Sequence, residues 1–119
     1  MPDSQVVLRY RDGRTERAAF AAVDAERAVF TVERNGARED VAFAELKAVF
    51  FPRTAPEEPL EPASGSTIAV EFADGEVIRG IAHYNPERNG FFLYPQDRSR
   101  NERIFVVRSA IVSIEVEKL

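Results

Sequence analysis

The sequence predicts an all-β protein made of two similar five-stranded units. The first observation is an internal repeat: residues 6–14 (VVLRYRDGR) recur as residues 68–76 (IAVEFADGE), and the register continues without a gap so that residues 29–32 align with residues 91–94. The second is the alternation of apolar and polar residues that opens each copy, and the third is the Asp-Gly pair that follows it. We therefore expect two tandem five-stranded small barrels packed on each other, or one fused sheet system that contains both units.

The boundary between the units is indicated by proline. Residues 54–66 contain three prolines, three acidic residues and no basic residue, and they end in a run of small residues. Proline is excluded from central strands and from helix interiors, so this segment is expected to be a linker. The chain then divides into a first β unit over residues 1–53, a Pro-rich acidic linker over 54–66, and a second β unit over 67–119.

Each unit is expected to contain its strands in the same order. Both begin with a strand whose apolar residues share one face, and Asp12-Gly13 or Asp74-Gly75 then forms a hairpin turn, since both turn positions favour positive φ. Short links at residues 44–46 and 108–110 are expected to be 3₁₀ turns before the last strands. The remaining strands are expected at residues 14–23, 29–34, 40–43 and 47–51, and at residues 76–84, 91–95, 103–107 and 111–117.

One segment carries a conflicting signal. Residues 17–33 are rich in Ala and Glu, and helix propensity alone predicts a helix there. The aligned segment of the second copy contains Gly80, Asn85-Pro86 and Asn89-Gly90, which favour strand, turn and strand. Because two copies of one ancestor share a fold, we expect strands in both.

Composition excludes several kinds of chemistry. The 119 residues include no cysteine, so disulfides, thiol catalysis and Cys-based metal sites are excluded. The formal net charge of −4 disfavours non-specific binding to nucleic acid, for which a net basic domain is typical. We expect a cytoplasmic protein without a membrane partner, because no signal-peptide pattern and no apolar run of about 20 residues is present.

The polar residues do not assemble a catalytic pattern. His83 is the single histidine, and no nucleophile or carboxylate partner is identified for it by spacing. The sequence also lacks a metal-ligand spacing, a phosphate-binding loop and a nucleophile elbow. We therefore expect no enzyme activity, no cofactor and no metal.

Two groups of residues are candidates for binding a partner protein. Arg98, Arg100 and Arg103 are expected in one exposed loop, with Arg88 nearby, where guanidinium groups suit bidentate contacts to carboxylates. The alternative is a solvated loop whose own acidic residues balance the charge.

The second group is aromatic. Neighbouring residues on a strand point to opposite faces, so one ring of each doublet, Phe50-Phe51 and Phe91-Phe92, must face outward from its barrel. Phe105 follows the same argument. Burying such a ring contributes about 1.5–3 kcal/mol. Either the two barrels cover Phe50, Phe91 and Phe105 by packing together, or these rings recruit a partner or a second copy of the chain.

The second half also resembles a known fold family. Asp74-Gly75, Gly80, Asn85-x-x-x-Asn89 and Arg108-Ser109 before Ile111-x-x-Ile114 follow the pattern of Sm-like domains, a variant of the SH3-like barrel. The first half keeps only Asp12-Gly13 and Asp24 of this pattern. The resemblance implies an alternative function in binding single-stranded RNA. The residues that it implies are Asn85 and Asn89 for the bases, Tyr84 or His83 for stacking, and Arg108 for the phosphate.

The whole chain is similar to an uncharacterised bacterial family of tandem β domains. The similarity rests on residues 46–51, 74–76, 90–95 and 101–107. It implies an adapter that binds another protein, with a bacterial small GTPase of cell motility and polarity, or its regulator, as a candidate partner. In that case the arginine loop would meet an acidic switch surface and binding would depend on the nucleotide.

Overall fold

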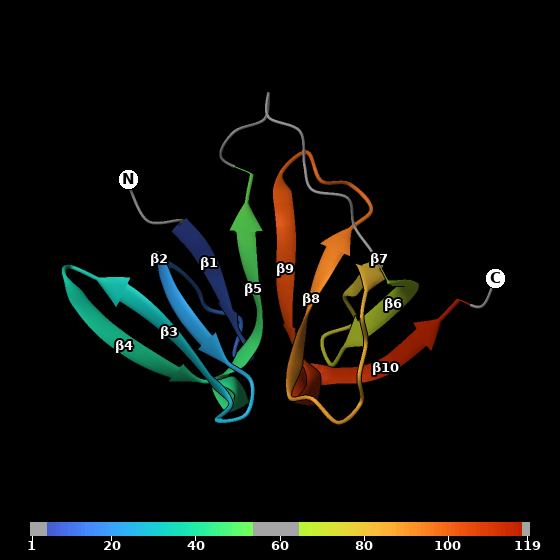
Figure 1. Ribbon diagram of the computed structural model, residues 1–119, viewed down its shortest axis with the longest axis horizontal. Coiled ribbons are helices and arrows are strands. Elements are labelled where there is room, and N and C mark those ends of the chain that lie inside the picture. Colours follow the sequence, from blue (N-terminus) through green and yellow to red (C-terminus); the bar gives the residue numbers. More distant parts are fainter. Residues whose placement is uncertain (1–4, 54–64, 118–119) are drawn as a thin grey trace.

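The computed structural model describes residues 5–53 and 65–117, and it confirms the all-β prediction. Ten antiparallel strands form one sheet (Figure 1). Residues 17–33 form two strands and a turn, so the helix that propensity favours is absent. The elements are β1 (Gln5–Tyr10), β2 (Thr15–Asp24), β3 (Val29–Arg34), β4 (Ala37–Ala42), η1 (Phe43–Glu45), β5 (Leu46–Pro52), β6 (Ser66–Phe72), β7 (Val77–Ala82), β8 (Gly90–Pro95), β9 (Asn101–Val107), η2 (Arg108–Ala110) and β10 (Ile111–Val116).

The expectation of two closed barrels packed on each other is wrong, and the alternative of one fused sheet system is confirmed. The strand order is β10-β6-β7-β8-β9-β5-β1-β2-β3-β4, so a single continuous sheet contains both halves. The halves are joined edge to edge, because β5 of the first half pairs with β9 of the second, for example Val49 opposite Phe105. Figure 1 shows β5 and β9 side by side at the centre, with the other strands of each half curving away on either side.

The order of strands within the two halves is the same. The first half has the order β5-β1-β2-β3-β4 and the second has β10-β6-β7-β8-β9. The predicted linker, except for its last two residues, lies outside the described residues. Within residues 5–53 and 65–117, no helix is long and apolar enough to span a membrane.

The gapless register of the repeat fails at the third strand. Phe20 lies opposite Val32 in the first half, and Ala82 lies opposite Leu93 in the second. The first pair is twelve residues apart (32 minus 20) and the second is eleven (93 minus 82). The extra residue lies at a β-bulge directly after Phe20, since a bulge inserts one unpaired residue into a strand.

The core runs through the junction between the halves. All residues of β5 before Pro52 are buried, so both faces of this strand are covered. Phe51 packs against Phe20 of its own half and Phe92 of the other half, with ring centroids 5.1 and 5.6 Å apart. Phe105 packs against Phe30 at 5.8 Å. One ring of each doublet, Phe51 or Phe92, therefore helps to hold the two halves together.

Candidate binding groove between the two halves

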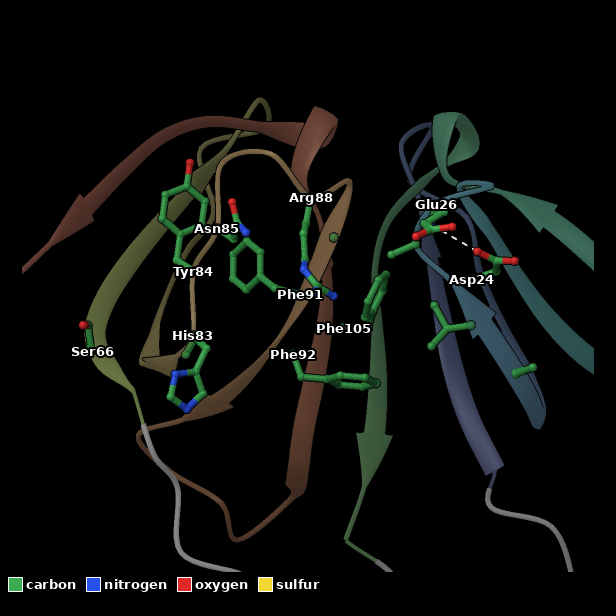
Figure 2. A pocket seen from close by; sticks show the side chains of 15 residues that line it. Asp24, Glu26, Ser66, His83, Tyr84, Asn85, Arg88, Phe91, Phe92 and Phe105 are labelled. Atoms are coloured by element: carbon green, nitrogen blue, oxygen red, sulfur yellow. Dashed lines mark hydrogen bonds between the residues drawn. The ribbon is translucent and has the colours of Figure 1, made fainter.

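A groove of about 920 Å³ lies where the turn between β2 and β3 approaches the loop between β7 and β8 (Figure 2). Its floor is aromatic, and its walls come from different halves of the chain. The lining residues are Ala22, Val23, Asp24, Ala25 and Glu26 from the first half, Ser66, Ala82, His83, Tyr84, Asn85 and Arg88 from the second, and Gly90, Phe91, Phe92 and Phe105 at the floor.

The second-half wall forms because β7 stops at Ala82. Pro86 has no backbone N–H to continue a ladder, and the Asn85 side chain accepts a hydrogen bond from the Glu87 backbone N–H at 2.9 Å, which turns the chain. Tyr84 lies edge-on to Phe91, with ring centroids 5.4 Å apart and an interplanar angle of 68°. His83 is exposed beside this pair.

The two walls carry opposite charge. Arg88 is exposed, and in Figure 2 its side chain extends into the space beside Phe91 and Phe105. Asp24 and Glu26 lie on the other wall, where Asp24 Oδ1 accepts the Glu26 backbone N–H at 3.1 Å. Among the described residues, none forms an ion pair with Arg88. A ligand in the groove would therefore meet a free guanidinium group on one side and carboxylates on the other.

The residues predicted from the Sm-like pattern lie together. His83, Tyr84 and Asn85 line the groove. Asn89 donates from Nδ2 to the Ala25 carbonyl oxygen at 2.7 Å, which links the two walls. The Arg108 backbone N–H donates to the Asn89 carbonyl oxygen at 2.9 Å, so Arg108 lies beside this loop.

The predicted arginine loop does not present three free guanidinium groups. Arg98 lies 5.0 Å from the Tyr94 ring centroid and donates from Nε to the Glu102 carbonyl oxygen at 3.1 Å. Arg103 belongs to β9 and is half-buried between the rings of Phe51 and Phe92, at 4.5 and 4.6 Å from their centroids. Of these three arginines, only Arg100 is exposed.

Arg88 is also separated from that loop. The Arg88 loop precedes β8 and the Arg98–Arg100 loop follows it, and Figure 1 shows the two loops at opposite ends of this strand. A six-residue strand is about 20 Å long. The arginines named from the sequence therefore do not form a single surface.

The predicted aromatic anchors are covered within the chain. Phe50, Phe91 and Phe105 are 9%, 6% and 2% exposed. The Arg9 guanidinium lies 4.4 Å from the Phe50 ring centroid. Phe91 and Phe105 line the groove floor, so a partner that touches them must enter the groove.

Sequence reasoning missed the acidic wall. In the sequence Asp24 matches only the Sm-like pattern and Glu26 falls between two expected strands, and nothing local to these residues indicates which distant loop they face. The available signal was the repeat, which aligns the two turns. Among the described residues, no cluster of three or more His, Asp or Glu side chains is arranged to hold a metal ion.

Comparison with known families matches residues 3–118 to the model of a family of unknown function, DUF6982, and the chain belongs to this family. Searches of curated proteins and of solved structures found no match.

Proposed function

We propose that this member of the DUF6982 family is a non-enzymatic adapter that binds another protein in the groove between its halves. The observation that carries the proposal is the combination of an aromatic floor with the free guanidinium group of Arg88 and the opposing carboxylates of Asp24 and Glu26. Aromatic and arginine side chains in a concave site are typical of the anchors of protein interfaces. A segment with an acidic residue, an apolar residue and a basic residue in sequence fits this arrangement.

The halves are proposed to be diverged copies of one SH3-like or Sm-like module. The shared strand order of the two halves supports this, as does the hairpin at Asp12-Gly13 and Asp74-Gly75. In this view the groove arises from the duplication, because corresponding turns of the two copies face each other across the joined strands.

A narrower candidate for the partner is a bacterial small GTPase of cell polarity or motility, or its regulator. Switch surfaces of acidic character would supply the carboxylate partner that Arg88 does not have among residues 5–53 and 65–117. Binding to such a partner is expected to differ between its two nucleotide states.

A second candidate function is binding of single-stranded RNA, and the clustering of His83, Tyr84 and Asn85 with Arg88 favours it. These side chains offer a stacking surface, an amide for base contacts and a cation for phosphate. The opposing carboxylates of Asp24 and Glu26 repel phosphate, and the net charge of −4 adds to this repulsion. We therefore rank protein binding first.

The experiment compares two single charge reversals in the full chain. Proteins captured from cell extract by the wild type are identified, and the affinity of the purified partner is then measured by calorimetry. Arg88→Glu is expected to weaken binding at least tenfold, whereas Arg100→Glu, at the far end of β8, leaves it unchanged. Equal affinities for all three chains would reject the groove as the protein-binding site.

RNA is tested with the same proteins by fluorescence anisotropy over a salt series. Weak binding at low salt with no dependence on Arg88 is expected if the groove is a protein site. A steep fall of affinity with salt that disappears in Arg88→Glu would instead support the RNA function.

A further inference from the structure

The two ends of the ten-stranded sheet are the strands β10 and β4, and they differ in chemistry. Among the described residues the exposed large apolar side chains are Val77, Val112 and Val116, and two of them belong to β10. Val112 is 61% exposed and Val116 is 44% exposed. By contrast, β4 presents the charged run Arg38-Glu39-Asp40, and all three residues are exposed. Charged residues protect an edge strand against pairing, whereas an apolar edge invites it.

Strand β10 has the same place in the strand order of the second half as β5 has in the first. The outer edge of β5 is already paired with β9. In the first half, Val49 of β5 lies opposite Leu8 on one side and opposite Phe105 of β9 on the other. In the second half, Ile114 of β10 lies opposite Val70, and no described strand pairs with its other side. The free edge of β10 is therefore the counterpart of the edge that β9 covers on β5.

We propose that the free edge of β10 binds an extended segment of a partner protein as an added antiparallel strand. This surface is separate from the groove, so the inference goes beyond the function proposed above. The recognition mode is strand addition, in which main-chain hydrogen bonds supply affinity and alternate side chains supply specificity. The chemistry of the segment follows from β9, which is the strand that this type of edge accepts within the chain.

Strand β4 of a second copy of the chain does not fit this edge. Suppose that β4 of a second copy paired with β10 in the register in which β9 pairs with β5. Glu39 would then lie opposite Glu115, in the place where Ile104 lies opposite Phe50. Two carboxylates directly opposite each other on neighbouring strands are destabilising. The adjacent pair places Asp40 opposite the apolar Ile114. The charged strand β4 of a second copy is therefore disfavoured as the added strand.

The same register describes what the added strand should contain. Its residue opposite Ile114 is apolar, as Phe105 is opposite Val49, and its residue opposite Val116 is an arginine, as Arg103 is opposite Phe51. Its residue opposite Glu115 is basic, because an opposite charge across strands is favourable. The partner segment is thus an extended strand with an apolar residue opposite Ile114 and a Lys or Arg opposite Glu115.

The test uses the full chain and three synthetic peptides. One has the sequence of residues 101–107 (NERIFVV), the second carries Ile104→Lys in the same sequence, and the control has the sequence of residues 37–42 (AREDVA). Binding is read as slowed hydrogen exchange of β10 amides. We expect the Ile104→Lys peptide to bind most tightly, the unchanged peptide to bind more weakly, and the control peptide not to bind.

Two valines of similar exposure provide matched protein variants. Val116→Lys places a cation opposite Arg103 of the Ile104→Lys peptide and is expected to weaken its binding at least tenfold, whereas Val77→Lys on β7, at 47% exposure, leaves it unchanged. Arg88→Glu is expected to have no effect, which separates this surface from the groove. Exchange in β1 and β6 confirms that each variant is folded.

Three outcomes would overturn the inference. The first is unchanged exchange of β10 with every peptide. The second is protection of β5 in place of β10, which would mean that the peptide displaces β9. The third is protection of β10 amides without peptide as the protein concentration rises, which would identify a second copy of the chain as the occupant.

Discussion

Lys47 is the buried charged residue that links the two halves within the described part of the chain. Its Nζ donates to Asp74 Oδ2 at 2.7 Å and also to Glu76, both in the second half. Burial alone would lower the pKa of Lys47, but the hydrogen bonds to the two carboxylates outweigh it and raise the pKa above the usual 10.5. The hydrogen bond from Lys47, together with the Glu76 backbone N–H, holds the pKa of Asp74 below its usual 3.8.

These shifts predict how Asp74→Asn changes stability with pH. A carboxyl group with a lowered pKa in the folded state stabilises the fold above its unfolded pKa, and that stabilisation is lost as pH falls through the folded pKa. The variant is therefore expected to be less stable than wild type at pH 7, and the difference should vanish in acid below the pKa of Asp74. It should also shrink in strong alkali, as pH rises through the raised pKa of Lys47.

The measurement is the free energy of unfolding by denaturant at a series of pH values. Asn retains an oxygen that can accept the backbone N–H of Glu76, so the comparison isolates the charge contact with Lys47. A difference of constant size from neutral pH to below the pKa of Asp74 would show that the ion pair is not its cause.

At the scale of single elements, Gly80 marks a close approach of β7 to β8. A Cβ atom at this position would lie 2.2 Å from the Tyr94 carbonyl oxygen and 2.7 Å from Leu93 Cδ2. The corresponding residue of the first half is Ala18, because Val6 lies opposite Ala18 as Ile68 lies opposite Gly80. The first half thus accommodates the methyl group that the second half excludes.

Gly80→Ala is therefore expected to lower the free energy of unfolding by about 1–3 kcal/mol, the usual cost of forcing extra volume into a packed site. The reverse change in the first half, Ala18→Gly, is expected to cost only about 0.5–1 kcal/mol through added chain entropy in the unfolded state. Both are measured by denaturant unfolding at pH 7. A neutral or stabilising Gly80→Ala would mean that β7 and β8 separate at no cost.

The strands themselves could be predicted because their signals are local. Val6, Leu8 and Tyr10 alternate along β1, and all three are buried as that alternation indicates. The pairing of β5 with β9 could not be predicted, because an apolar run such as that of β5 shows that both faces are covered without indicating which strand lies beside it. The bulge after Phe20 was hidden for a related reason, since a period of two does not reveal where one residue is skipped.

Only the second-half wall of the candidate groove could be predicted from the sequence. The motif around Asn85 and Asn89 pointed to the second-half wall, because turn residues at fixed spacing are visible in sequence. The wall carrying Asp24 comes from a turn about sixty residues away in the chain, and it depends on the same unpredicted pairing of the halves. Arg88 was expected only near the loop of Arg98 and Arg103, and that grouping required a loop geometry that ring stacking overrides.

At the scale of the whole molecule, the aromatic cluster makes the two halves interdependent. Phe105 of β9 contacts Phe30 and Phe43 of the first half, at centroid distances of 5.8 and 5.3 Å, and Phe92 of the second half at 5.2 Å. Removing the Phe105 ring would therefore expose apolar surface in both halves. We therefore expect residues of both halves to unfold in one cooperative transition.

Phe105→Ala tests this expectation. Removing a buried phenylalanine ring typically costs about 3–5 kcal/mol, which is a large fraction of the roughly 5–15 kcal/mol that holds a small protein folded. Hydrogen exchange of amides in β1 and in β6 is expected to accelerate by the same factor, since one ring supports both. Val112→Ala, an exposed change on β10, is the control and is expected to leave both rates unchanged. If exchange accelerated in β6 while β1 kept its protection, the halves would be independent folding units, and the β5–β9 pairing would be a contact between them and not part of a shared core.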